Sequence, residues 1–322
     1  MDRQDLYKPI QNELNQVREI LGETHREDLM PIQELLSYAM EVPGKLVRPA
    51  LTLLAAKCCG EINVDHAVEV ATAVELLHMA SLIQDDTIDE ANVRRGRPTV
   101  NKIWGRDIAM LVGDFLFSKA AELTCEANDI RIIRSYARAS KDASAGELSE
   151  LLANFDITVT QEQYMERIRA KTASLFSTAT EAGGLVSSAT QEQTEALRVY
   201  GVKLGLAFQI IDDVMDFQST ESDIGKPVTH DLSQGILTLP SILFLTKHPD
   251  NSVISNAFQD IDRDENIARA IELIQGDTVM AQTHRVAEKL IREAQDALSI
   301  FEPSESLESL HGVATYVLKR EQ

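Results

Sequence analysis

Apolar residues recur every three or four positions along most of this chain, and this spacing constrains its fold more than any other feature. In residues 64–86 the repeating positions are Val64, Ala67, Val68, Ala71, Val74 and Leu77. Such spacing places apolar side chains on one face of an α-helix. Residues 104–127, 130–155 and 192–217 show the same periodicity. Several of these segments are apolar over much of their circumference, which is typical of central helices in a large bundle.

Helix-breaking residues are few and clustered. The 322 residues include only 9 prolines and 15 glycines. They gather at Pro43–Gly44, Gly96–Pro98 and Gly225–Pro227, where loops are predicted. No linker, low-complexity run or clear internal repeat divides the chain. The sequence therefore predicts a single all-α domain, a helical bundle, over residues 1–322.

Bulk composition excludes several functional classes. A formal net charge of -20 opposes binding to a nucleic-acid backbone. No run approaches the roughly 18 apolar residues of a membrane span, and the N-terminus lacks a signal-peptide core. Three cysteines, Cys58, Cys59 and Cys125, lack metal-ligand spacing. An odd number of such thiols predicts a reduced, cytoplasmic protein.

Three aspartates close the apolar segment that begins near Val64. On a helix, Asp85 and Asp89 lie one turn apart on the same face, with Asp86 beside them. Carboxylates packed this closely repel one another unless a cation lies between them, and magnesium prefers such hard oxygen ligands. A solvated acidic helix end explains this motif equally well when it is taken alone.

The same spacing returns at Asp212, Asp213 and Asp216, again after a strongly apolar segment. Here the flanking residues, among them Ile211 and Phe217, predict burial, and unpaired buried carboxylates are costly. Two aspartate triads at matching helix ends indicate a shared metal cluster.

Basic residues supply the charge that such a cluster and a polyphosphate would need. Arginine forks and lysine ammonium groups are the usual protein ligands of diphosphate oxygens. The candidates, with one neighbouring threonine, are Lys45, Arg48, Arg94, Arg95, Lys171, Thr172 and Lys226. Each cation taken singly is more simply a surface residue, and His78 alone is more simply a satisfied core histidine. Their value as evidence is collective.

The combination of motifs resembles the trans-isoprenyl diphosphate synthase (polyprenyl synthetase) family, of the long-chain type exemplified by octaprenyl diphosphate synthase. The segments that carry the resemblance, in order along residues 43–240, are "GKLVRP", "ELLHMASLIQDDTIDEANVRRGRPTVN", "WGRDIAMLVGDFLFSKA", "KTASLF", "GLAFQIIDDVMDF" and "GKPVTHDLSQGILTLP". The resemblance implies an all-helical isoprenoid synthase fold with a deep central cavity, usually in a homodimer. It also implies a prenyltransferase that couples isopentenyl diphosphate head-to-tail to an allylic diphosphate, with three Mg²⁺ ions.

The resemblance assigns roles to individual residues. Metal ligation would fall mainly to Asp85, Asp89 and Asp212, supported by Asp86, Asp213 and Asp216. The allylic diphosphate would be bound by Arg94, Lys171, Thr172, Gln209 and Lys226. Isopentenyl diphosphate would be bound by Lys45, Arg48, His78 and Arg95.

Product length is the finer question. Ala80 and Ser81 precede the first triad and lie about 6–8 Å up a helix from Asp85, given a rise of about 1.5 Å per residue. Short-chain members of the family typically place an aromatic residue there, so small side chains predict long products, of roughly thirty to fifty carbons. The alternative is that the two residues only permit close helix packing, with the tunnel blocked deeper.

The sequence departs from the family pattern at two positions and is also compatible with three rival functions. Gln84 replaces a histidine common in relatives, and Ile236 stands where many relatives carry a lysine after Gly235. The rivals are a shorter-chain farnesyl or geranylgeranyl diphosphate synthase, a terpene cyclase, and a non-catalytic subunit of a heteromeric synthase. Paired triads together with "GKLVRP" disfavour the cyclase, and retention of the basic residues disfavours the inactive subunit.

Overall fold

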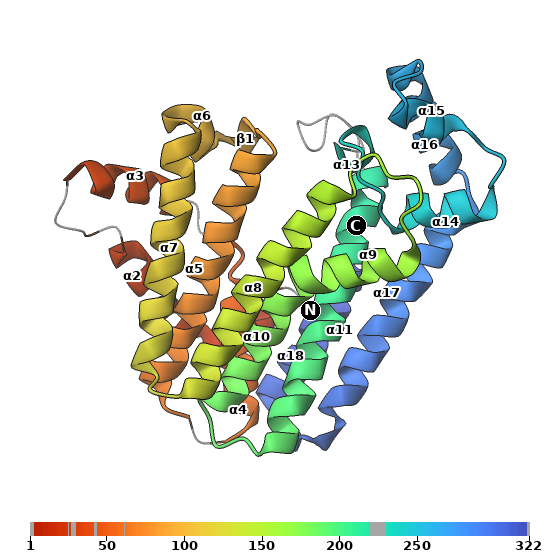
Figure 1. Ribbon diagram of the computed structural model, residues 1–322. Helices are drawn as coiled ribbons and strands as arrows, with labels where there is room; N and C mark the ends of the chain where they lie inside the picture. The colour runs from red at the N-terminus through yellow and green to blue at the C-terminus, as the bar shows by residue number, and fades with distance from the viewer. Residues whose placement is uncertain are drawn as a thin grey trace. The chain divides into compact units, whose positions relative to one another are not determined.

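The computed structural model describes residues 3–24, 26, 30–41, 44–60, 62–218 and 230–320. Most of these residues are helical, and one short antiparallel strand pair is present within the described ranges (Figure 1). The prediction of an all-α protein is confirmed. The loop expected at Gly225–Pro227 and the predicted ligand Lys226 lie outside the described residues.

The elements follow one another with short connections. In chain order they are α1 (Arg3–Leu6), η1 (Lys8–Ile10), α2 (Gln11–Glu23), α3 (Met30–Met40), α4 (Val47–Cys58), α5 (Val64–Ile88), β1 (Val93–Arg94), β2 (Arg97–Pro98), α6 (Val100–Trp104), α7 (Arg106–Glu126), α8 (Ile130–Leu152), α9 (Gln161–Ile168), η2 (Arg169–Ala173), α10 (Ser174–Leu185), α11 (Gln191–Gln218), α13 (His230–Ser233), α14 (Leu239–Lys247), α15 (Val253–Phe258), α16 (Arg263–Gln275), α17 (Thr278–Ala297), η3 (Leu298–Ile300) and α18 (Glu305–Leu318).

The chain divides into two compact units. The first comprises Met1–Lys141, Leu175–Gly201 and Ala297–Val313, and the second comprises Asp142–Ser174, Val202–Asp296 and Ala314–Gln322. The prediction of a single domain over residues 1–322 stays a prediction.

Helix α5 is the centre of the first unit. It runs beside α7 and also contacts α2, α4 and α6 (Figure 1). Asn63 begins the helix, because its side-chain oxygen accepts a hydrogen bond from the His66 N–H at 3.3 Å. Most residues between Ala67 and Leu77 are buried, as the apolar circumference of the sequence predicts.

The apolar character of α5 corrects one expectation from the sequence. By length and composition, α5 could cross a membrane, although no run of that kind was expected. In the structure, 61% of its most apolar window is buried inside the protein. Its hydropathy is therefore accounted for by packing against neighbouring helices.

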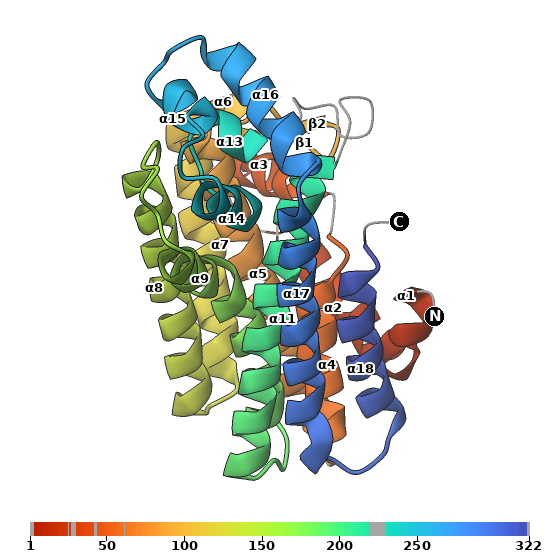
Figure 2. The same cartoon turned by 90° about the vertical axis from the view of Figure 1, so that its right-hand side faces the viewer.

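The second unit places its helices around the latter half of α11. Figure 2 shows this half running beside α17, and Lys203 Nζ forms an ion pair with Glu293 Oε2 at 2.6 Å. Helix α9 contacts α14, and the buried Arg167 donates a hydrogen bond to the Leu237 carbonyl at 2.6 Å. Helix α9 continues directly into η2, a π-helical turn that contains Lys171 and Thr172.

Candidate active site

The C-terminal end of α5 separates its three aspartates by environment. Asp86 is only 6% exposed, and Arg94 Nε donates to its Oδ2 at 2.6 Å. Asp85 is half-buried and Asp89 is exposed. The outer two carboxylates therefore share a face that ligands can reach, whereas the middle carboxylate is occupied by an arginine.

A tight hairpin after α5 positions the neighbouring arginines. Strands β1 and β2 pair antiparallel, with Arg94 opposite Arg97. The two turn residues both have positive φ, 52° at Arg95 and 77° at Gly96. This is the backbone of a type I′ hairpin turn, which places glycine well but strains arginine. Arg95 is thus fixed in an uncommon conformation beside the acidic helix end.

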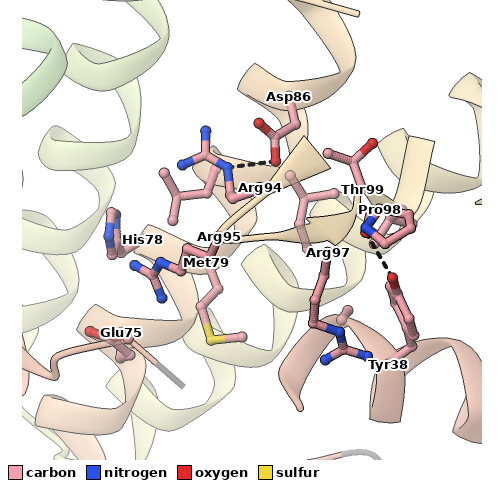
Figure 3. A pocket seen from close by; sticks show the side chains of 15 residues that line it. Tyr38, Glu75, His78, Met79, Asp86, Arg94, Arg95, Arg97, Pro98 and Thr99 are labelled. Carbon is pink, nitrogen blue, oxygen red and sulfur yellow. Dashed lines mark hydrogen bonds and ion pairs between the residues drawn. The ribbon is translucent and has the colours of Figure 1, made fainter. Parts of the chain in front are cut away.

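These segments line a cavity of about 110 Å³ within the first unit (Figure 3). Four predicted site residues meet there, namely His78, Asp86, Arg94 and Arg95. Gly44 also lines the cavity and is followed directly by Lys45, whose side chain is exposed. Arg97 lines the cavity as well. Three arginines and a histidine at one small cavity make it suitable for an anion.

Arg48 lies close to this group although it does not line the cavity. Its guanidinium carbon is 4.5 Å from the centre of the Phe176 ring. Burial raises the pKa of the nearby Glu75 carboxyl, and the positive charges of Arg48 and Arg95 oppose that rise. The structure therefore brings Arg48 to the same region as His78 and Arg95.

His78 faces the cavity from α5 and is half-buried. Burial lowers its pKa well below 6.5, and the positive charges of Arg48, Arg95 and Arg94 lower it further. At neutral pH the ring is uncharged and can offer one N–H to a ligand.

The end of α11, in the second unit, shows the same separation of aspartates. Asp213 is 3% exposed and accepts hydrogen bonds from Tyr164 Oη at 2.5 Å and Gln209 Nε2 at 2.8 Å. Burial raises the pKa of Asp213 to about 7. Asp212 and Asp216 are only half-buried. In both triads the middle aspartate is the most buried and is held by protein groups, and the outer two are less buried, although Asp212 also pairs with Arg320.

The predicted allylic ligands of the second unit form two connected groups. Thr172 Oγ1 donates to Gln209 Oε1 at 2.7 Å, so the threonine joins the network around Asp213. Lys171 Nζ forms ion pairs with Glu147 Oε2 at 2.7 Å and with Glu150 Oε1 at 2.6 Å. A diphosphate would have to share the lysine with these carboxylates or displace them.

The structure adds residues that sequence reasoning missed. Arg320, near the end of the chain, forms an ion pair with Asp212 Oδ1 at 2.9 Å and lies over the Phe208 ring. Tyr164 and Glu150 are likewise distant in sequence from the residues that they contact. Glu75 alone carried a local signal, since it is an acidic residue three positions before His78 within the largely apolar stretch 70–83.

The two residues that depart from the family pattern have different local surroundings. Gln84 Nε2 donates to Asp114 Oδ1 of α7 at 3.0 Å. A Cβ on Gly113 would lie 2.7 Å from Gln84 Cγ, so the glycine makes room for this contact. Ile236 follows Gly235, whose φ is 82° and whose carbonyl accepts the Phe155 N–H at 2.8 Å.

The residues predicted to set product length do not line the cavity of Figure 3. Ala80 is 1% exposed. Ser81 is half-buried, and its hydroxyl donates to the His78 carbonyl at 2.9 Å. Their neighbours Met79, Leu82 and Ile83 on α5 supply the apolar wall of that cavity.

The donor groups at both helix ends suit a divalent cation. Asp85, Asp89, Asp212 and Asp216 offer carboxylate oxygens, the ligands that Mg²⁺ and Ca²⁺ prefer. Among the described residues, no group of three or more such side chains is already arranged as a metal site.

Comparison with known proteins decides the family. A family model described as polyprenyl synthetase matches residues 30–274. The chain belongs to the polyprenyl synthetase family. It is a prenyl diphosphate synthase, a transferase of prenyl groups, as its motifs predict. The predicted family and enzyme class are confirmed.

Individual relatives cover nearly the whole chain. An all-trans-nonaprenyl-diphosphate synthase (geranyl-diphosphate specific) of Rhodobacter capsulatus is 31% identical over 99% of this chain and 98% of its own. A short chain isoprenyl diphosphate synthase of Methanothermobacter thermautotrophicus is 35% identical over 95% and 94%. The crystal structure of a polyprenyl synthase from Caulobacter crescentus, complexed with calcium and isoprenyl diphosphate, matches with a TM-score of 0.92. It is 32% identical, and the match covers 100% of this chain and 98% of that one. The predicted isoprenoid synthase type of fold is confirmed.

Proposed function

We propose that this enzyme condenses isopentenyl diphosphate with an allylic diphosphate, head-to-tail and all-trans, to make a long-chain polyprenyl diphosphate. The observation that carries the proposal is the shared design of the two aspartate triads. In each, the middle aspartate is buried and held by protein groups, while the outer two lie on the same helix face and are less buried. Basic residues lie near both triads.

We propose Mg²⁺, as three ions, as the metal cofactor, held by Asp85, Asp89, Asp212 and Asp216. Calcium in the Caulobacter crescentus relative supports a divalent cation. When bound, the metal stabilises the negative charge that develops on the departing diphosphate. Asp86 and Asp213 would support these ligands, and protein groups already hold each of them at its helix end.

The side chains around the metal ligands would bind and orient the two substrates. We assign isopentenyl diphosphate to the first unit, where Lys45, Arg48, His78 and Arg95 gather beside the cavity. The neutral His78 ring donates a hydrogen bond there without adding charge. Met79, Leu82 and Ile83 make the adjoining wall apolar, which favours the isoprene unit and excludes water.

Binding of the allylic diphosphate falls to Arg94, Lys171, Thr172, Gln209 and Lys226. Arg94 and Lys171 are already paired with carboxylates, and Thr172 and Gln209 are already oriented by their mutual hydrogen bond. These cations would stabilise charge on the leaving group in the transition state. Proximity of the two substrates then accounts for further acceleration.

Product length is where two candidates compete. The nonaprenyl name of the Rhodobacter capsulatus relative bears out the long-chain prediction. The small residues near Asp85 predict a product of roughly thirty to fifty carbons. A shorter-chain farnesyl or geranylgeranyl synthase is the second candidate, favoured by the short chain name of the Methanothermobacter relative.

The deciding experiment incubates the purified protein with Mg²⁺, farnesyl diphosphate and isopentenyl diphosphate, and sizes the products. Products longer than geranylgeranyl diphosphate support the long-chain assignment, and chains that stop there refute it. Turnover by this protein alone also refutes the alternative of a non-catalytic subunit of a heteromeric synthase.

We also propose a homodimer in the cytoplasm. Ile103, Ile108 and Leu111 on α6 and α7 are 45%, 37% and 66% exposed, and apolar side chains gathered on adjacent elements favour contact with another protein surface. The three cysteines are free thiols, which suits a reducing compartment. Light scattering on the purified protein gives the molar mass, and a monomer at micromolar concentration would contradict the dimer.

A further inference from the structure

Glu75 is an acidic residue in a place that should bind an anion. It lies on α5, one turn before His78, and is 3% exposed. It lines the cavity of Figure 3 together with Arg94, Arg95 and His78. A carboxylate at this position repels a diphosphate, and its burial is costly unless cations compensate it. Its presence therefore requires an explanation other than direct substrate binding.

Arginines from two other segments surround this carboxylate. Arg48 belongs to the first turn of α4, and Arg95 belongs to the turn between β1 and β2. Burial raises the pKa of Glu75, and these same two arginines act against that rise. A Cβ on Gly44 would lie 3.2 Å from Glu75 Oε1 and 3.4 Å from Arg95 Nη1, so the carboxylate and the guanidinium flank one glycine.

Arg95 is the arginine whose orientation depends most on a fixed negative charge such as that of Glu75. Its backbone has a φ of 52°, and its side chain is largely exposed. Figure 3 shows the guanidinium directed toward the side of the cavity where Glu75 and His78 lie. A long, exposed side chain in a turn has many alternative rotamers, and a fixed negative charge favours those that point inward. Orientation before binding strengthens binding, because less freedom is lost when the ligand arrives.

We infer that Glu75 is a positioning residue whose carboxylate holds the Arg48 and Arg95 guanidinium groups in the orientation that binds isopentenyl diphosphate. This inference rests on the proposed function, which assigns both arginines to that substrate. Glu75 does not touch the substrate. It acts through the two arginines.

The substitution Glu75→Gln separates positioning from simple charge. Glutamine keeps the shape of the side chain and removes its negative charge. If charge alone mattered, loss of an anion near the site would tighten diphosphate binding and lower the KM for isopentenyl diphosphate. Positioning predicts the opposite, a KM raised about tenfold or more, with the KM for the allylic diphosphate changed less than about threefold. An unchanged or lowered KM for isopentenyl diphosphate would overturn the inference.

A matched control and a direct binding measurement complete the design. Glu69→Gln makes the same change on the same helix outside the cavity, and it should leave both KM values unchanged. Calorimetric titration with inorganic diphosphate should show weaker binding to Glu75→Gln than to the unmodified protein. In an Arg95→Ala background the substitution at Glu75 should have a smaller effect, whereas an equally large effect would exclude action through Arg95.

Two further observations keep the test decisive. If Glu75→Gln fails to fold, as judged by circular dichroism, Glu75→Asp replaces it. Its shorter reach should still raise the KM for isopentenyl diphosphate, and an unchanged KM would overturn the inference. An unmodified protein without prenyl coupling would refute the proposed function. An active unmodified protein in which Glu75→Gln keeps the normal KM would refute only the role of Glu75.

Discussion

At the scale of single residues, neighbouring aspartates of one motif have different tasks. Asp86 and Asp213 are buried and bound by Arg94 or by Tyr164 and Gln209, whereas Asp85 and Asp212 are only half-buried. A buried carboxylate with protein partners contributes to stability, and an accessible one is available to metal. Identical side chains one position apart should therefore respond differently to the same substitution.

Replacement of Asp85 by Asn tests this difference. We expect kcat to fall by about 10²–10³-fold, because an accessible metal-ligand charge is lost near the leaving group. The melting temperature should change little. The matched substitution Asp86→Asn should lower the free energy of unfolding by about 1–3 kcal/mol, because it disrupts a buried, charge-assisted hydrogen bond. Steady-state kinetics and thermal unfolding measure both effects, and equal melting temperatures for the two variants would contradict the assignment.

His78 should make stability depend on pH. Its folded-state pKa lies well below the ordinary 6.5, so below that pH the unfolded chain binds a proton that the folded protein does not. The free energy of unfolding should therefore fall as pH drops from about 7 toward 5, by at most about 1.4 kcal/mol per unit from this group. Denaturant unfolding of the unmodified protein and of His78→Asn checks this. The free energy of unfolding of the variant should depend less on pH. Parallel curves of unfolding free energy against pH for the two proteins would contradict this role of His78.

At the scale of elements, the β1–β2 hairpin presents two arginines through its backbone conformation. Gly96→Val should destabilise the turn by about 1–2 kcal/mol, because a φ of 77° is unfavourable for a residue with a side chain. An added Cβ meets no atom within 4 Å, so steric contact at the Cβ does not contribute. We expect a raised KM for isopentenyl diphosphate, since Arg95 shares the turn.

The control for the hairpin is Gly96→Asn, because asparagine tolerates the left-handed region better than most residues. It should keep both the melting temperature and the KM near those of the unmodified protein. Thermal unfolding and steady-state kinetics on the three proteins provide the comparison. Similar losses in the valine and asparagine variants would show that the turn conformation is not the cause.

Helix α5 also allows a test of the prediction about product length. Ala80→Phe places a large ring one to two turns before Asp85, and products should become shorter if the growing chain passes this position. Because Ala80 is 1% exposed, overpacking should cost about 1–3 kcal/mol of stability. Product sizing by chromatography measures the effect. Ser81→Phe, at a more exposed neighbouring position, gives the comparison, and unchanged products in both variants would place the length determinant elsewhere.

At the scale of the whole molecule, the expected shared metal cluster stays a prediction with a clear test. Removal of divalent cations with EDTA should abolish prenyl coupling and leave the helical circular dichroism spectrum intact, because the fold is built from apolar packing. The double variant Asp85→Ala/Asp212→Ala should lose little more kcat than the single variant with the larger loss. The reason is that the effects of groups that act as a unit are not additive. Additive losses would indicate that the motifs act independently.

Much of the site was predictable because its signals are local in sequence. Asp85 and Asp89 are four residues apart, so helical geometry alone places them on one face. The cavity then gathers His78, Asp86, Arg94 and Arg95, all of which the motifs named. The partners of these residues were not predictable in the same way. Arg320 contacts Asp212, which lies more than a hundred residues earlier in the chain. Tyr164 contacts Asp213, which lies about fifty residues later.

The sequence by itself determined the helical class, the family and the positions of the acidic motifs, because periodicity and spacing act over a few residues. Only the tertiary structure decided which aspartate of each triad is buried, where Lys171 is paired, and that Glu75 lies among arginines. Burial and charge compensation depend on groups brought together from distant segments. A local pattern specifies which side chains point the same way, but not which other side chains they meet.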